Sequence, residues 1–390
     1  MQYLDGINIE TVAFFRCCIS KIVICDGEVL FNNTNSTVWV CKTAVYRGTT
    51  PVVCSNHVTR LRLIEGVQPE FIADTLNLLR ERGYFARLCT NFNNQAGVNS
   101  DTLAAVRLPF PDRAKREKLL AALDAAREQR RAKIAEADAL LASLDDYLLA
   151  TLKLTPPPPD TRKVFAVRHA IIPNRFDPHF YSPELMRNQR MLAEAGAETL
   201  GSQISFSTEI WKPETHDEPV FRYIEISSVS PQTGEAVAEE TAVAEAPSRA
   251  RMMVRTGDII VSLTRPHHGS IAQITPELDG CIASTGFAVL RNVGKRLDRD
   301  YLWCILRSSI CLKQMQQRAS GGNYPAITEH ELANVAIPVP PIPVQTAIAA
   351  ESRRRRETAR TLRAEAESLW HSAKQEFERQ LLGSRSIASQ

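Results

Sequence analysis

The sequence predicts an α+β protein in which two mixed α/β domains, the first of them shortened, are separated by two long helices that pair as a coiled coil. Two observations support this fold class: a long helical segment with a narrow apolar stripe occurs twice, and the segments before it repeat in the same order. With 390 residues and a hydrophobic share of 44%, the chain can form more than one core.

The first long helix is predicted over Arg113–Leu152, which contains no glycine or proline. Its apolar residues recur in steps of three and four, which places them on one side of a helix: Ile134, Ala137, Leu141, Leu144 and Leu148. The same rhythm returns from Gln345 to Leu382. Because a lone helix with so narrow a stripe is marginal in water, we expect the two helices to pack side by side. A solvated surface helix is the alternative, but it does not explain why the pattern occurs twice.

Short apolar runs alternate with polar turns before the first long helix. Asp26-Gly27 is a tight-turn dipeptide and predicts a hairpin between the strands on either side of it. The expected strands are Lys21–Cys25, Val29–Phe31, Val38–Cys41 and Val52–Cys54. The expected later elements are a helix over Pro69–Gly83 that ends at its glycine, a polar loop at Asn91–Gly97 and a short helical turn within Ser100–Val106.

The second half repeats this order, because Gly257 lies 230 positions after Gly27 and similar offsets recur at later landmarks. The matching segments are Gly257–Val261, the helix Asp300–Arg307, the loop Ser320–Pro325 and the Pro motif Leu332–Pro340. Two segments have no match. Thr155–Asp160, with four prolines, is expected to be an extended linker or simply a helix stop, and Ser230–Arg249 is expected to be a solvated, flexible insertion.

The two domains differ at their starts. The second runs for about 60 residues before Tyr223–Ile226, whereas the first reaches the similar Tyr3–Ile9 at once. The first domain therefore lacks an opening block, either because the assigned gene start is late or because the domain is shortened. The predicted boundaries are 1–111 for the incomplete first domain, 112–154 for the first long helix, 155–161 for the linker, 162–341 for the second domain, 342–383 for the second long helix and 384–390 for a disordered tail.

Catalytic and metal-binding motifs are weak. The chain has no phosphate-binding G-x-x-x-x-G-K-[ST] loop and no dinucleotide-binding G-x-G-x-x-G after a strand. Gly280–Gly286 resembles a nucleophile elbow only loosely, and the vicinal His267 and His268 would diverge on a strand. The nine cysteines show no C-x-x-C spacing, and no signal peptide or membrane span is evident. We therefore expect a cytoplasmic chain with no catalytic residue, cofactor or metal of its own.

Hydrogen-bond donors recur instead in loops that follow equivalent strands. In the major groove of DNA, Asn or Gln side chains can read adenine and Arg can read guanine, while other cations bind phosphates. The candidate DNA-binding residues are Asn32, Asn33, Asn35, Lys42, Arg60, Arg62, Asn93, Asn94, Gln95, Thr264, Arg265, His267, His268, Arg318, Ser320, Asn323 and Tyr324. For any one of them an ordinary polar turn is an equal explanation, so the prediction rests on their recurrence in both halves.

In this order the motifs resemble those of the specificity subunits of type I restriction–modification enzymes. The resemblance rests on Gly257–Val261, on Gly286–Leu290, on Ile337–Pro341 with Gln345 and Ile348 leading into a long helix, and on Arg175–Tyr181. It implies two target recognition domains that read a bipartite sequence in double-stranded DNA, with the long helices packed antiparallel as a spacer. It also implies docking of two modification (methyltransferase) subunits, and of restriction subunits through the complex, with no membrane contact.

The same resemblance implies that this chain is non-catalytic, with S-adenosylmethionine and ATP/Mg bound by partner subunits. A coiled-coil scaffold, or an inactive truncated relic of such a subunit, is one alternative. A methyltransferase with fused recognition is another, but it would need a cofactor-binding Gly loop and an Asn-Pro-Pro-aromatic motif, and the sequence has neither.

Overall fold

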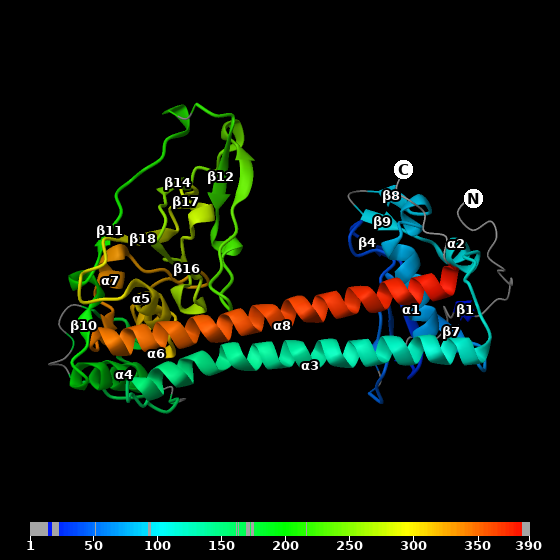
Figure 1. The fold of residues 1–390 in the computed structure, drawn as a ribbon, viewed down its shortest axis with the longest axis horizontal. Coiled ribbons are helices and arrows are strands. Elements are labelled where there is room, and N and C mark those ends of the chain that lie inside the picture. The colour runs from blue at the N-terminus through cyan, green and yellow to red at the C-terminus, as the bar shows by residue number, and fades with distance from the viewer. Residues whose placement is uncertain are drawn as a thin grey trace. The chain divides into compact units, whose positions relative to one another are not determined.

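The computed structural model describes residues 15–17, 23–50, 52–92, 95–160, 162, 164–168, 172, 175–215 and 217–383. The chain divides into two compact units, each of mixed helix and strand (Figure 1). Unit 1 comprises Met1–Ile134 and Arg363–Gln390, and unit 2 comprises Ala135–Leu362. Each unit contains part of both long helices, so the domain boundaries predicted from the sequence stay a prediction. None of the described helices is long and apolar enough to cross a membrane.

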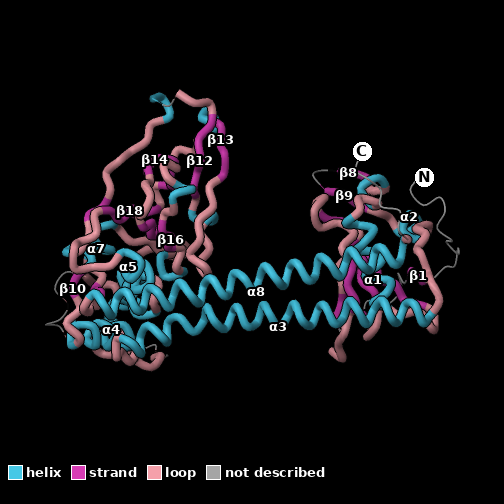
Figure 2. The backbone as a smooth tube through the Cα atoms, viewed as in Figure 1, coloured by secondary structure: helices cyan, strands magenta, loops and turns pink. Residues whose placement is uncertain are grey.

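The two long helices are α3 (Arg113–Thr151) and α8 (Ile342–Leu382), and each runs without a break (Figure 2). In unit 1 the start of α3 packs on the end of α8, where Leu119 and Leu123 share a core with Phe377 and Leu381. In unit 2 the end of α3 meets the start of α8, with Leu148 and Ile348 in one core. The helices are therefore antiparallel, as expected, and α8 begins at Ile342, three residues before the start of the apolar rhythm at Gln345.

Polar contacts accompany this helix pairing in both units. In unit 1, Lys133 Nζ lies 2.6 Å from Glu365 Oε2, and Arg130 Nη2 lies 2.6 Å from Glu367 Oε1. In unit 2, Arg355 Nη1 donates to the Ser143 carbonyl at 2.9 Å. The exposed ion pairs contribute little to stability, so the apolar stripe supplies most of the pairing energy.

Unit 1 is built on a four-stranded antiparallel sheet in the order β1-β7-β3-β5. Its strands are β1 (Phe15–Cys17), β3 (Val29–Asn32), β5 (Thr43–Val45) and β7 (Val58–Leu63). Beside it lie the pair β2 (Val23–Ile24) and β6 (Val52–Val53), and a three-stranded sheet of β4 (Thr34–Asn35), β8 (Thr90–Phe92) and β9 (Gln95–Gly97). Helix α1 (Pro69–Glu81) buries Phe71 and Leu76 against Phe31 of the main sheet.

The main sheet of unit 2 has the order β11-β18-β15-β16. Its strands are β11 (Ser205–Phe206), β15 (Ile259–Ser262), β16 (Ile271–Gln273) and β18 (Phe287–Arg291). Ile259 and Val261 face a core with the helices, whereas Ile260 faces the second sheet. Both faces of β15 are therefore covered, which explains why it is an uninterrupted apolar run.

The remaining elements of unit 2 surround this sheet. A second sheet, in the order β13-β12-β17-β14, contains β12 (Val220–Ile224), β13 (Glu239–Ala242), β14 (Ala250–Met253) and β17 (Ile282–Ser284). A short pair joins β10 (Glu198–Thr199) to β19 (Ala336–Ile337). The helices are α4 (Pro183–Glu194), α5 (Arg299–Leu306), α6 (Ser309–Arg318) and α7 (Glu329–Ala333).

The repeat predicted from the sequence is present in the structure. β3 pairs antiparallel with β5 and β7, and β15 pairs antiparallel with β16 and β18 at matching positions. The short helix before the Pro motif is α2 (Ser100–Ala104) in unit 1 and α7 in unit 2. Asn99 caps the first and Thr328 the second, each accepting a backbone N–H three residues on. The two units therefore share one core architecture.

Several local predictions were wrong. The strands on either side of Asp26-Gly27 do not form a hairpin, because β2 pairs with β6 while β3 pairs with β5 and β7. Val38–Cys41 is a turn, Asn91–Gly97 contains the strands β8 and β9, and Ser230–Arg249 contains β13. Arg307 Nη2 also fixes this insertion by donating to the Pro231 carbonyl at 2.9 Å. The segment Tyr3–Ile9 lies outside the described residues.

Candidate nucleic-acid interface

The candidate residues of unit 2 gather where β15 ends. Thr264 and Ser320 both form a β-bridge with Ala326, which brings the loop after β15 beside the loop after α6. In unit 1, Asn35 of β4 and Asn91 of β8 both pair with Ala96. These are equivalent positions of the repeat, so each unit holds two polar loops together at the same end of equivalent strands. The loops could be predicted from the sequence, and the structure shows that they are in contact.

Arg265 occupies the centre of the unit 2 loops. Its φ of +47° is left-handed, a conformation that non-glycine residues adopt only when their surroundings hold it. Its backbone N–H donates to the Pro325 carbonyl at 2.7 Å. Its Nε and Nη2 donate to the Asn323 carbonyl at 3.1 and 2.7 Å, and its guanidinium lies 4.4 Å from the centre of the Tyr324 ring. Tyr324 itself is 71% exposed.

The two histidines after Arg265 lie on a short 3₁₀ turn, Pro266–His268, and not on a strand. Their rings meet edge to face with centroids 4.6 Å apart, so they do not diverge as predicted. Partial burial lowers the pKa of His267, and the charges of His268, Arg265 and His179 act in the same direction. Among the described residues no group of three or more His, Cys, Asp or Glu side chains could hold a metal ion.

A cavity of about 1160 Å³ borders this loop cluster within unit 2. Arg175, His179, His267 and Arg318 line it, together with Asp177 and Glu331. Arg318 Nη1 lies 3.2 Å from Glu331 Oε2, and Arg175 Nη1 lies 3.4 Å from Glu331 Oε1. Arg318, a candidate DNA contact, is therefore paired with a carboxylate. The segment that includes Arg175 and Asp177 was not among the predicted DNA-binding residues.

In unit 1 the predicted amides are largely engaged with their own backbone. Asn32 Nδ2 donates to the Trp39 carbonyl, Asn33 Nδ2 to the Asn56 carbonyl, and Asn35 Oδ1 accepts from the Ser36 N–H. Gln95 is exposed on β9, and Asn93 and Asn94 lie outside the described residues.

An exposed aromatic ring lies on the turn between β4 and β5. Lys42 Nζ lies 4.6 Å from the centre of the Trp39 ring, which is 51% exposed. Sequence reasoning missed Trp39, because it read Val38–Cys41 as a strand. Both units thus present an exposed aromatic ring stacked with a cation beside the end of the equivalent strand.

Arg60 and Arg62, predicted as phosphate contacts, both lie beside the carboxylate of Glu28. Arg60 is 4% exposed and donates through Nη1 to the Val23 carbonyl at 2.7 Å, and Arg62 Nη2 donates to Glu28 Oε1 at 2.7 Å. Glu28 also accepts the Cys25 N–H. The burial of Arg60 and this partner of Arg62 argue against the predicted phosphate contacts. Both arginines instead hold a turn and two strands together.

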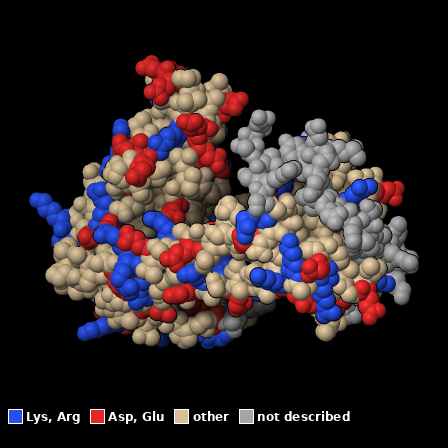
Figure 3. Space-filling model, turned by 45° about the vertical axis from the view of Figure 1, so that its right-hand side comes forward, with Lys and Arg blue, Asp and Glu red and all other residues tan. Residues whose placement is uncertain are grey.

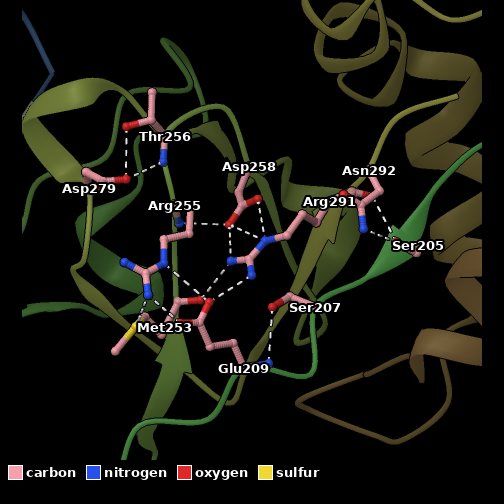
Figure 4. A network of polar contacts seen from close by, with 10 residues as sticks. All are labelled: Ser205, Ser207, Glu209, Met253, Arg255, Thr256, Asp258, Asp279, Arg291 and Asn292. Carbon is pink, nitrogen blue, oxygen red and sulfur yellow. Dashed lines mark hydrogen bonds and ion pairs between the residues drawn. The ribbon is translucent and has the colours of Figure 1, made fainter. Parts of the chain in front are cut away.

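The same arrangement occurs in unit 2, where Asp258 occupies the position equivalent to Glu28 and Arg291 the position equivalent to Arg62 (Figure 4). Asp258 accepts from Arg291 Nε at 2.9 Å and Nη2 at 2.7 Å, and from the Arg255 N–H at 2.8 Å. Arg291 Nη1 reaches Glu209 Oε2 at 2.8 Å, and Arg255 pairs with Glu209 as well. This repeated carboxylate–arginine pair is a structural feature of the fold.

The Glu209 contacts predict how stability depends on pH. Hydrogen bonds from Arg255 and Arg291 hold the pKa of Glu209 below its ordinary value. Its contribution is therefore fully present above the unfolded carboxyl pKa of about 4.3 and is lost as the pH falls through the lowered folded pKa. We expect Glu209→Gln to weaken the fall in stability between about pH 5 and pH 3. Urea unfolding of both forms across this range measures the difference, and equal slopes would contradict it.

The charge distribution favours the loop end of unit 2 for a polyanion. In the space-filling view, acidic side chains gather around the sheet that carries β12 and β13 (Figure 3). Exposed carboxylates there include Glu218, Glu239, Glu240 and Glu245. Because acidic surface repels the DNA backbone, a DNA contact is better placed on the loops around Arg265.

The comparisons with known proteins agree with the motifs. Residues 212–351 match the family model of the type I restriction modification DNA specificity domain. This match includes Gly257–Val261, Gly286–Leu290 and Ile337–Pro341, and it confirms the resemblance predicted from the sequence. No curated protein matches the chain.

Three solved structures are similar to this chain. The HsdS subunit from Thermoanaerobacter tengcongensis is 35% identical with a TM-score of 0.38, over 44% of this chain and 45% of that one, so the match spans less than half of that subunit. A chain from the structural work on assembly and conformational transition of the type I R-M system is 19% identical with a TM-score of 0.51, over 93% and 83%. The S subunit from M. genitalium is 14% identical with a TM-score of 0.43, over 94% and 85%. The second of these shares its fold with the present chain.

Proposed function

We propose that the chain is the sequence-recognition subunit of a type I restriction–modification complex, because residues 212–351 match the family model of the type I restriction modification DNA specificity domain. In this proposal it reads a bipartite target in double-stranded DNA and docks two modification subunits, and restriction subunits through the complex. It performs no catalysis in the cytoplasm where it acts. S-adenosylmethionine and ATP/Mg are bound by its partners.

The observation that carries the proposal is the duplicated architecture. β3 and β15 each pair antiparallel with two strands at equivalent positions, and each is followed by two polar loops that meet at the strand end. Two equivalent reading surfaces suit a target made of two half-sites. Donor-bearing loops supply the amide and guanidinium groups that base edges require.

The long helices support a fixed separation of the half-sites. At about 1.5 Å per residue, the 39 residues of α3 span roughly 60 Å, compared with about 34 Å for one turn of DNA. Paired antiparallel helices bend less than a single one. A bipartite target with a constant spacer follows from such a strut.

A map of modified bases tests the function. The chain and its modification partners are expressed in a host without other DNA methylation, and the methylated motif is read by single-molecule sequencing. We expect one bipartite motif that disappears when this chain is left out. Methylation without sequence preference, or none at all, would instead favour the scaffold or inactive relic.

Asn323 gives a residue-level prediction of the same function. Its exposed side chain lies beside Arg265, and its carbonyl, which Arg265 uses, survives truncation. We expect Asn323→Ala to reduce the preference for the native base at one position of one half-site by about 5- to 150-fold. Recognition of the other half-site should be unchanged. The methylated-motif map measures this preference.

Asn334→Ala is the matched control, because Asn334 is also exposed and its side chain contacts only the His330 carbonyl among the described residues. This control should keep the full motif. Equal weakening of all sequences by Asn323→Ala would identify a contact that carries no base information.

A further inference from the structure

Arg265 differs from four other arginines near the unit 2 loops in having no carboxylate partner among the described residues. Arg175 and Arg318 pair with Glu331, and Arg255 and Arg291 pair with Glu209. No described carboxylate pairs with Arg265, whose described side-chain contacts are the Asn323 carbonyl and the Tyr324 ring. A cation whose charge is not neutralised by any described carboxylate is available to an external acceptor.

The guanidinium is fixed in position and orientation. Its inner edge, formed by Nε and Nη2, donates to one carbonyl oxygen at 3.1 and 2.7 Å. Its face lies 4.4 Å from the Tyr324 ring centre, and the left-handed backbone of Arg265 is tied to Pro325 by a 2.7 Å hydrogen bond. A side chain that is already ordered loses little entropy when it binds a partner of matching geometry.

The remaining donors define what the side chain can recognise. Arginine has five N–H groups, and the inner edge uses one on Nε and one on Nη2. The outer edge, Nη1 with Nη2, keeps two parallel N–H donors. Guanine presents two acceptors, O6 and N7, to such a fork, whereas adenine presents one acceptor beside a donor. A phosphate could also accept both of these N–H groups. A phosphate contact does not require a guanidinium held in one plane, however, because a mobile cation neutralises a phosphate equally well.

We infer that Arg265 reads a guanine in the half-site contacted by unit 2, and that Tyr324 and the Asn323 carbonyl are its positioning groups. This inference rests on the proposed function and adds to it one recognised base. It also gives a reason for the left-handed backbone of Arg265, which accompanies the placement of the guanidinium between the two positioning groups.

The test uses the full chain with its modification subunits and the methylated-motif map. The variants are Arg265→Gln, which removes the fork, and Arg265→Lys, which keeps the charge without bidentate geometry. We expect the native motif to contain a required guanine in one half-site, and both variants to lose that preference by about 10- to 100-fold while every other position is kept.

Two further variants test the positioning role and the specificity of the effect. Tyr324→Ala should weaken the same guanine position, and Tyr324→Phe, which keeps the ring, should restore it. Arg296→Gln removes a surface arginine beyond the opposite end of the antiparallel strand β18 and should leave the motif unchanged. Thermal unfolding of each variant distinguishes a variant that fails to fold from a folded variant that no longer recognises the guanine.

The outcomes separate the two proposals. If the native complex methylates no sequence-specific motif, the proposed function fails. If a bipartite motif is found but has no guanine in either half-site, or if Arg265→Lys retains the full motif, the guanine assignment fails while the function stands. Uniform weakening at all positions by Arg265→Gln would make Arg265 a phosphate contact and would also overturn the inference.

Discussion

Inserting one heptad into each long helix is expected to lengthen the gap between the two half-sites by about three base pairs. Seven helical residues add about 10 Å, and DNA rises about 3.4 Å per base pair. A heptad also turns the helix through nearly two full turns, with a drift of only about 20°. The added residues should therefore displace one reading surface along the DNA with almost no rotation about the helix axis. Because DNA turns by about 100° over three base pairs, the bound DNA must also twist to present the shifted half-site.

The insertions belong after Ile134 in α3 and after Leu362 in α8, where the two units divide. They should repeat the three-four spacing, so that the apolar stripe marked by Ala137 and Ala366 continues. The methylated-motif map should show loss of the original target and appearance of the same half-sites with the longer spacer. An insertion of seven residues after Gly383 adds the same length outside the helix pair and should leave the spacer unaltered.

If the variant with both helices lengthened keeps the original spacer, the length of the helices does not set the distance between the half-sites. An insertion into α3 alone is a further check, because it shifts the apolar residues of α3 by two helical turns relative to the apolar residues of α8 on which they pack. That variant should methylate neither target efficiently.

The long helices and the repeat could be predicted from the sequence because their signals are periodic or duplicated. The stripe that includes Ala137 and Leu148 depends only on spacing within one segment, and both residues are buried. Strand pairing was harder to predict. Val23–Ile24 and Val29–Asn32 are separated by a turn dipeptide, yet each pairs with a strand much later in the chain. Local turn chemistry does not reveal such distant partners.

Charge alone does not distinguish an arginine that pairs with a carboxylate from one that does not. Arg62 and Arg265 look equally suited to DNA in the sequence, but Arg62 faces Glu28 and Arg265 faces no described carboxylate. One sequence signal could have distinguished them. Glu28 and Arg62 recur at the matching repeat positions as Asp258 and Arg291, so a paired opposite charge is repeated in the same register.

Asp258→Ala is expected to destabilise unit 2 by about 3 kcal/mol. The carboxylate is 3% exposed and accepts hydrogen bonds from Nε and Nη2 of Arg291 and from the Arg255 N–H. Its removal leaves a turn without its side-chain acceptor and leaves Arg291 with Glu209 as its carboxylate partner among the described residues. For a unit of this size the melting temperature should fall by roughly 6–12 °C, as measured by scanning calorimetry.

A double-mutant cycle shows how much of the loss comes from the interaction between Asp258 and Arg291. Adding Arg291→Met to Asp258→Ala removes the cation as well and should recover part of the stability, because an apolar side chain needs no counter-charge. Glu28→Ala is the matched change in unit 1, where Glu28 accepts from Arg62 and from the Cys25 N–H and pairs with the buried Arg60 at 3.7 Å, and the loss of stability should be of similar size. If Asp258→Ala melts like the native chain, the carboxylate–arginine pair is not what fixes the turn that leads into β15, and the positions of the loops at the end of this strand must then depend on the apolar cores alone.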